Sequence, residues 1–339
     1  MHPKRRAIMR SDARATSFVA SATWSVIASC VFLLTAAPPS ASAAAASDAR
    51  APRAFDSPQA AVDALIDAAD KYDVAALEAI FGPEGDDIVH SGEPARDKER
   101  AAAFVAKARE KKSIATDPST PARAVLVIGA EDWPMPVPIV KRGDGWIFDS
   151  KAGLQEILYR RIGGNELDAI QICRGYVEAQ DEYALGRHGE GGVAAYAQRI
   201  ISTPGKQDGL AWQNSDGTWA GPIGERVAQV IEQGYTKGEP YHGYFFKILK
   251  GQGRSAPLGR LDYVVKGVMI GGFALAAAPA EYRVTGVKTF IVSNDGVVYE
   301  KDLGPGTLEQ FKKMELFDPD KSWRPVEAPP SQPGAPTES

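Results

Sequence analysis

Three histidines, His90, His188 and His242, are the side chains best suited to acid–base chemistry or metal binding once the first 43 residues are set aside. They lie far apart, and none has a second histidine or a cysteine at the spacing of a zinc site. The sequence has no Gly-x-Ser-x-Gly motif, so a serine-hydrolase nucleophile has no local support. We therefore expect no metal and no cofactor, and we assign no catalytic residue.

Aromatic residues form the most distinctive candidate for ligand binding. Residues 241–246 have the sequence Tyr-His-Gly-Tyr-Phe-Phe, and two tryptophans precede them. These side chains could line a binding surface. In a strand, however, Tyr244 and Phe246 would point into a core while Tyr241 and Phe245 covered the opposite face. The sequence favours this core interpretation, and the candidate ligand-binding residues are Trp212, Trp219, Tyr241, His242 and Tyr244.

Other reactive groups carry less information. Glu84, Asp86 and Asp87 follow Gly82-Pro83 and have the character of a solvated acidic loop rather than a cation site. Cys173 lies in a helical pattern and is expected to be a buried, inert thiol. The second cysteine, Cys30, falls in the N-terminal leader, so no internal disulfide is expected in the processed protein.

The elements that position these residues begin with helices. Ser57-Pro58 is a helix start, and apolar spacing predicts a helix through Lys71. A second helix should start after Asp73 and end at Gly82-Pro83, and a third should cover about 95–112. Strand patterns follow at 124–128, 137–141 and 145–148. Helices followed by an antiparallel sheet predict an α+β domain.

The second half repeats the order of helix and then strands. A helical pattern covers 151–161, Gly163-Gly164 should break it, and Asn165 with Asp168 should cap a new long helix. The expected apolar face of this helix is Leu167, Ile170, Cys173, Val177 and Ala184. A shorter helix is predicted at about 224–233, and strands at 244–248, 262–265, 272–277, 288–293 and 297–300. Asn294-Asp295-Gly296 predicts a hairpin between the last two strands.

The N-terminus has the pattern of an export signal. A basic start precedes a mostly apolar stretch at 24–37, and Ala41-Ser42-Ala43 is a signal-peptidase site. A membrane anchor is the alternative, but the uninterrupted apolar run from Cys30 to Ala37 is short and ends at Pro38-Pro39. Cleavage at Cys30 as a lipoprotein is a second alternative. We expect a periplasmic or secreted protein without a stable membrane anchor after processing.

Composition and length bound the domain organisation. The chain has 339 residues, of which 44% are hydrophobic and 24% charged, which is typical of a globular protein with about two domains. Its net charge is −4, and it lacks a basic stripe interleaved with aromatics, so nucleic acid is excluded as the expected partner. The predicted divisions are a signal peptide (1–43), a disordered lead-in (44–54), an N-terminal α+β domain (55–160), a C-terminal helix-plus-antiparallel-sheet domain (161–324) and a disordered tail (325–339).

Several separated motifs occur together in one order along the chain. They are Gly145–Asp149, Arg160–Glu166, Tyr176–Gln180, Pro240–Tyr244 and Met269–Phe273. With these motifs, the sequence over roughly 55–316 resembles the bacterial exported family catalogued as domain of unknown function 2950. This resemblance implies an exported protein of unassigned activity and carries over no catalytic residue.

The two halves also resemble known folds. Motifs from Asn165-Glu166 to Asp295–Val298 are similar to the soluble part of type IV pilin-like and pseudopilin proteins, which implies a helix packed on an antiparallel sheet. The hydrophobic stem that pilins use for assembly is absent before Asn165, so filament building is not expected. The first half resembles the cystatin/nuclear-transport-factor-like α+β fold.

Three functional hypotheses follow. The leading one is a non-enzymatic binding or accessory protein of the cell envelope, which binds a partner protein or small ligand in a groove between its halves. The second is an envelope hydrolase or other enzyme that uses His242 with a carboxylate such as Asp262. The third is an accessory factor of a pilus or secretion machine. A histidine, a carboxylate and a nucleophile in one pocket would favour the enzyme, whereas an apolar groove without them would favour binding.

Overall fold

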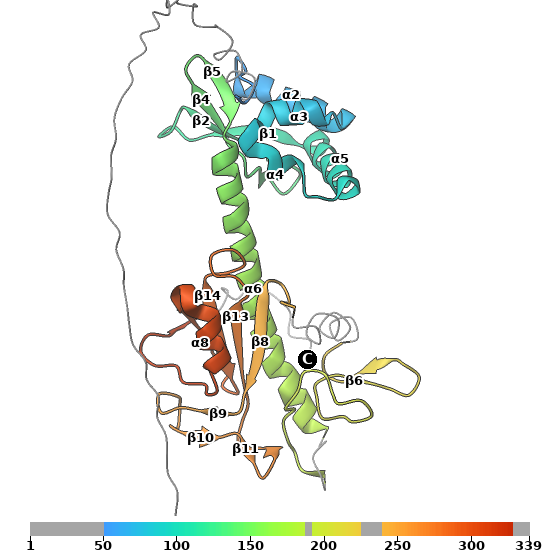
Figure 1. Ribbon diagram of the computed structural model, residues 1–339, viewed down its shortest axis with the longest axis vertical. Helices are drawn as coiled ribbons and strands as arrows, with labels where there is room; N and C mark the ends of the chain where they lie inside the picture. Colours follow the sequence, from blue (N-terminus) through green and yellow to red (C-terminus); the bar gives the residue numbers. More distant parts are fainter. Residues whose placement is uncertain (1–50, 187–191, 225–238, 328–339) are drawn as a thin grey trace, which may run out of the picture. The chain divides into compact units, whose positions relative to one another are not determined.

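The computed structural model describes residues 51–186, 192–224 and 239–327 (Figure 1). Its first helix, α2 (Pro58–Lys71), is capped by the Ser57 hydroxyl, which accepts a hydrogen bond from the Ala60 amide. Helix α3 (Val74–Phe81) is capped in the same way by the Asp73 carboxylate. Both helices therefore begin and end where the sequence predicts. The single turns η1 (Pro83–Gly85) and α4 (Asp86–Val89) and the helix α5 (Pro94–Glu110) follow.

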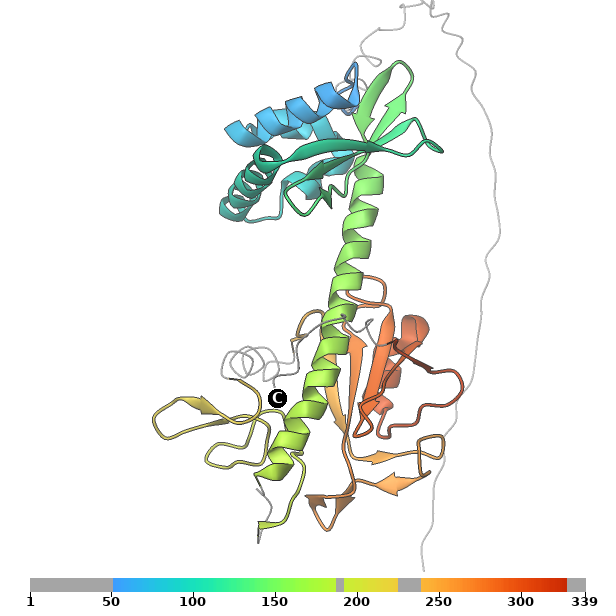
Figure 2. The same ribbon diagram turned by 180° about the vertical axis from the view of Figure 1, so that it is seen from behind.

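An antiparallel sheet completes the N-terminal half. Its strands have the order β1-β2-β4-β5, and β3 also pairs with β2. Alternate residues of β2 are buried, so one face of the strand lies against the core. Helices α2 and α3 contact this sheet at β5 (Figure 2). The strands are β1 (Lys112–Thr116), β2 (Arg123–Ile128), β3 (Trp133–Pro134), β4 (Ile139–Arg142) and β5 (Gly145–Phe148).

One continuous helix, α6 (Ser150–Leu185), joins the N-terminal sheet to the second half. The predicted break at Gly163-Gly164 is therefore wrong, and Asn165 and Asp168 are interior positions rather than caps. A glycine lowers helix stability by only about 1 kcal/mol relative to alanine. Tertiary contacts hold α6 on both sides of these glycines. It touches η1 and α4 of the first half, and in the second half it touches β13 (Ala274–Pro279), β14 (Lys288–Ser293) and β15 (Val298–Asp302).

The buried face of α6 also differs from the predicted one. Leu167, expected in the core, is 64% exposed. The face of α6 that packs on the sheet begins two residues later, and Val177 lies only at its margin. An α-helix has about 3.6 residues per turn, so residues spaced three apart drift around the helix axis. The contact with the sheet, rather than the sequence spacing, therefore determines where the buried face begins. Its main residues are Ala169, Ile170, Cys173, Tyr176, Gln180 and Tyr183.

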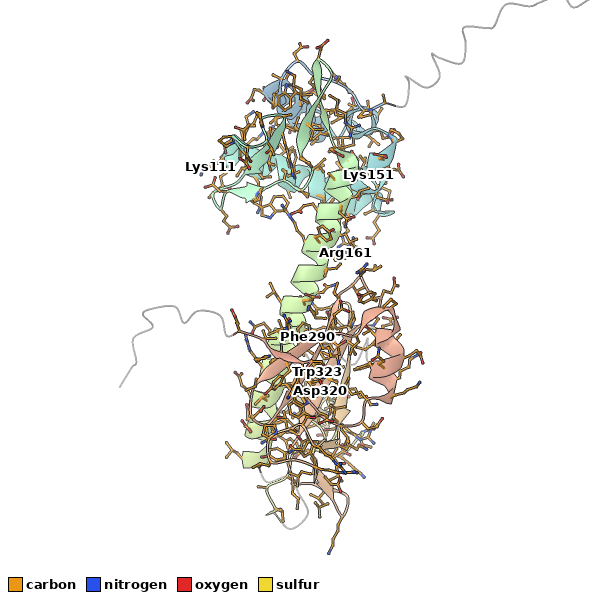
Figure 3. All side chains as sticks on the ribbon, turned by 90° about the vertical axis from the view of Figure 1, so that its left-hand side faces the viewer. Lys111, Lys151, Arg161, Phe290, Asp320 and Trp323 are labelled. Carbon is orange, nitrogen blue, oxygen red and sulfur yellow. The ribbon has the colours of Figure 1, made fainter. Side chains whose placement is uncertain are left out.

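The C-terminal half contains an antiparallel sheet of five strands in the order β16-β15-β14-β13-β8. Helix α6 lies against one face and α8 (Thr307–Lys313) against the other (Figures 1 and 2). All six residues of β13 are buried, which requires cover on both faces. Phe290, labelled in Figure 3, is fully buried within this sheet. The strands are β8 (Tyr244–Leu249), β13 (Ala274–Pro279), β14 (Lys288–Ser293), β15 (Val298–Asp302) and β16 (Arg324–Pro325).

These observations confirm the α+β class and the hairpin between β14 and β15, in which Val292 pairs with Val298. Pro325, placed at the start of the predicted tail, pairs with Tyr299. The predicted helix at 224–233 lies almost wholly outside the described residues. The remaining short elements are β6 (Trp212–Gln213), β7 (Trp219–Ala220), β9 (Gly251–Gln252), β10 (Leu261–Asp262), β11 (Val264–Val265), β12 (Val268–Met269) and η3 (Gly304–Gly306).

Candidate functional site

The aromatic segment that starts at Tyr241 forms a tight turn before β8. Tyr241 and Tyr244 exchange two backbone hydrogen bonds of 2.8 and 3.0 Å, with His242 and Gly243 between them. Both central residues have positive φ, +48° and +74°. This is the backbone of a two-residue hairpin turn of type I′, and histidine is one of the residues that adopts it more readily than most.

The turn lies directly on α6. His242 Nδ1 is 2.7 Å from an oxygen of Asp168, and the Tyr241 and His242 rings meet edge to face with centroids 4.4 Å apart. A Cβ atom at position 243 would lie 2.6 Å from Asn165 Nδ2. Glycine is therefore required at position 243 both by φ and by the close approach of the helix.

Asn165 and Glu166 bind a second loop. The Asn165 amide donates to the carbonyl of Thr285 at 2.8 Å, and a Glu166 oxygen accepts from the amides of Val287 and Lys288 at 2.9 and 3.0 Å. We name Asn165, Glu166 and Asp168 the α6 anchor. The polar residues interpreted as a helix start in fact hold two turns of the sheet against the middle of one helix.

The five candidate ligand-binding residues do not form one surface. Tyr244 is fully buried, its hydroxyl donates to the Lys288 carbonyl at 2.9 Å, and burial raises its pKa. It belongs to the core, as the alternating pattern favours. Trp212 packs at the margin of the C-terminal core, and Trp219 lies on the partner strand β7, in register with Gln213. His242 is engaged with Asp168, which leaves Tyr241 as the candidate that lines a cavity.

This cavity, the C-terminal cavity, has a volume of about 460 Å³, which is within the range of about 300–1,000 Å³ typical of small-molecule sites. Side chains of α6 form one wall, residues 222–224 and Ile200 a second, and Tyr241, Phe246 and Leu275 the sheet side. Phe246 and Leu275 share a sheet face because Phe246 pairs with Ala277 and Leu275 lies two residues away. The sequence alone did not identify the α6 wall, since its residues have ordinary helical character.

The charge of the C-terminal cavity is acidic. Glu178 and Glu182 line it from successive turns of α6, and both are exposed. Neither forms an ion pair with a described residue, and the described lining contains no lysine, arginine or histidine. Carboxylates four residues apart on a helix repel each other, so a cation bound between them would relieve this repulsion.

Catalytic chemistry finds less support. His242 hydrogen-bonds to Asp168 rather than to the expected Asp262, which pairs with Gly251 beyond the far end of β8. Six strand residues span about 20 Å, so these two groups lie at opposite ends of the strand. Among described residues, no serine, threonine or cysteine hydrogen-bonds to His242. Cys173 is buried, which raises its pKa to about 12 and keeps the thiol protonated.

Metal and membrane signatures are missing from the three described ranges. Those ranges contain no group of three or more His, Cys, Asp or Glu side chains arranged to hold a metal ion. Within the same stretches of chain, no helix combines the length and apolar character needed to span a bilayer.

Comparison with known proteins gives one match. The model of a family described as a protein of unknown function (DUF2950) matches residues 52–326, which is most of the chain. No curated protein matches. No solved structure matches either, so the pilin-like and cystatin/nuclear-transport-factor-like resemblances remain expectations.

Proposed function

The chain belongs to the DUF2950 family, and from that premise we propose that it is an exported, non-enzymatic binding protein of the bacterial cell envelope. The observation that carries the proposal is the C-terminal cavity, which joins an apolar floor to two carboxylates without ion-pair partners among the described residues. Export is supported by the basic start, the apolar run and the Ala41-Ser42-Ala43 site. The proposed site lies within the C-terminal half rather than in a groove between halves.

The chemistry of the lining indicates the class of ligand. Tyr176, Tyr241 and Phe246 offer aromatic surface for an apolar body. Glu178 and Glu182 favour a positive charge at the edge of that surface. The ligand that fits both features is a small amphiphile or aromatic compound with a protonated amine. The same two glutamates would repel a ligand that carries a carboxylate.

The test compares two ligands with the same hydrocarbon chain and different head groups. Isothermal titration of protein that starts at Ala44 should give tighter binding of dodecylamine than of dodecanol. The double variant Glu178→Gln/Glu182→Gln should lower dodecylamine affinity at least tenfold, since it removes both carboxylates and keeps the side-chain shape. The matched control is Asp181→Asn, which changes an exposed acidic residue of α6 outside the described lining.

Two results would contradict the proposal. The first is equal affinity of the original protein for dodecylamine and dodecanol. The second is an effect of Asp181→Asn as large as that of the double glutamine variant, which would indicate only a long-range response to net charge.

One observation favours the enzyme hypothesis, namely the hydrogen bond between His242 and Asp168, because a carboxylate that orients an imidazole is a common part of hydrolytic sites. We propose instead that this pair holds the turn on α6. Chromogenic esters should show no hydrolysis above background. A hydrolysis rate that is present in the original protein and lost in both His242→Ala and Asp168→Asn, with the fold retained, would support the enzyme.

A further inference from the structure

A second cavity lies wholly within the N-terminal half, between α2, α5 and the strands β2 and β3. This N-terminal cavity has a volume of about 410 Å³. Its deep wall consists of the buried side chains Leu65, Leu77, Phe81 and Ile128. The half-buried rings and chains around them, including Phe104, are also apolar. The N-terminal cavity therefore resembles a small-molecule site with a hydrophobic interior.

The edge of the N-terminal cavity is basic, in contrast to that of the C-terminal cavity. Helix α5 contributes Arg100, Phe104 and Lys107, whose spacings of four and three place them on one face of the helix. Lys107 forms no ion pair with a described residue. Arg100 has one partner there, Asp97, at 4.0 Å.

Asp97 does not neutralise this edge fully. Its carboxylate is 7% exposed, and both oxygens accept hydrogen bonds from the Ser91 amide, at 3.2 and 3.1 Å. The carboxylate is therefore committed to closing the turn before α5. The described lining contains two cations and one anion, and Phe104 stands between the two cations along the helix.

We propose that the N-terminal cavity binds a fatty acid, with the hydrocarbon chain against Leu65, Phe81 and Phe104 and the carboxylate at Arg100 and Lys107. Charge complementarity selects an anionic head group. The volume of about 410 Å³ is near the lower end of small-molecule sites, so it suits one hydrocarbon chain rather than a two-chain lipid. This site is independent of the proposed amine site and has the opposite head-group preference.

The test uses dodecanoate and dodecanol with the full protein from Ala44 onward, measured by isothermal titration below their aggregation concentrations. Dodecanoate should bind at least tenfold more tightly than dodecanol. Arg100→Glu/Lys107→Glu should lower dodecanoate affinity at least tenfold and leave dodecanol affinity within twofold. The control, Arg96→Glu/Lys98→Glu, makes the same charge change at exposed positions of α5 outside the described lining and should have little effect.

A second variant locates the binding. Ala101→Phe places a ring at the cavity wall and should abolish binding of both dodecanoate and dodecanol there, while dodecylamine binding at the C-terminal cavity is unchanged. Circular dichroism checks that the variant is folded; if it is not, the head-group comparison decides alone. The proposal is overturned if the original protein binds no dodecanoate. It is also overturned if the two double charge-reversal variants weaken dodecanoate binding equally, or if a folded Ala101→Phe protein still binds dodecanoate.

Discussion

Gly243 offers a test of the α6 anchor at the level of one residue. Replacement by alanine combines a left-handed backbone with a contact of 2.6 Å to Asn165 Nδ2. We expect Gly243→Ala to lower the free energy of unfolding by more than about 1 kcal/mol. Gly296 is the matched control, because it has the same φ of +74° and nothing within 4 Å of an added Cβ atom. Urea unfolding should show a larger loss for Gly243→Ala, and equal losses would mean that contact with α6 contributes nothing.

His90 gives a prediction about pH. A hydrogen bond of 2.9 Å to Glu78, with Asp86 nearby, raises the pKa of its imidazole. The folded state then favours the protonated form, so this stabilisation is complete below the unfolded pKa of about 6.5 and is lost as pH rises through the folded pKa. Glu78→Gln should return the His90 pKa towards 6.5 in an NMR titration. Glu84→Gln, which removes a carboxylate of the same half that does not hydrogen-bond to His90, should shift it less.

At the scale of elements, two apolar residues of α6 that are three positions apart differ strongly in burial. Ile170 is 9% exposed and packs in the C-terminal core, whereas Leu167 is 64% exposed on the same helix. Ile170→Asp buries an uncompensated carboxylate and should lower the free energy of unfolding by several kcal/mol. Leu167→Asp should change it by less than about 0.5 kcal/mol. Thermal unfolding of both variants checks this, and similar melting temperatures would show that α6 does not pack as described.

The sequence predicted the elements well where adjacent residues determine the structure, as at helix caps and tight turns. Ser57 and Asp73 cap α2 and α3 as expected, and Asn294-Asp295-Gly296 joins β14 to β15. The prediction of a helix break was wrong because Gly163-Gly164 lowers helix stability only locally, and tertiary contacts on both sides of these residues outweigh that loss. The α6 anchor was missed for the same reason, since Asn165 and Glu166 bind residues about 120 positions away.

The candidate site was predicted only in part. Tyr241 carried a recognisable motif, and it lines the C-terminal cavity. Glu178 and Glu182 are two among many helical glutamates, and only the packing of α6 shows that they share a cavity edge. A single sequence provides no signal for such a convergence of separate segments.

For the whole molecule, the first prediction concerns processing. The leader predicts a mature N-terminus at Ala44, because Ala41-Ser42-Ala43 has the small residues that signal peptidase requires. Mass spectrometry of protein from its native host should find this terminus. A lipid on Cys30 would establish the lipoprotein alternative, and an intact Met1 in the membrane fraction would contradict export by cleavage.

The second concerns the connection between the halves. Arg160 donates to the carbonyl of Pro134 at 2.8 Å, and Asn165 donates to that of Thr285 at 2.8 Å, so residues 161–164 of α6 are all that separates these contacts. Because helical backbone resists proteases, trypsin should cut after Arg50 and Arg53 before it cuts at Arg160 or Arg161. Early release of two stable fragments at these arginines would instead show that the halves are independent.

The α6 anchor also fixes when the second half can fold. The hydrogen bonds of Asn165 and Glu166 join positions 120 to 122 residues apart, an interval that takes roughly 6–24 s to synthesise at about 5–20 residues per second. Ile170 and Tyr176 are made near the start of this interval, whereas β14, which contacts α6, begins only at its end. The nascent chain therefore exposes an apolar helix face early, and the strands that bury it are synthesised late. The C-terminal half can therefore complete its fold only after Lys288 has been synthesised.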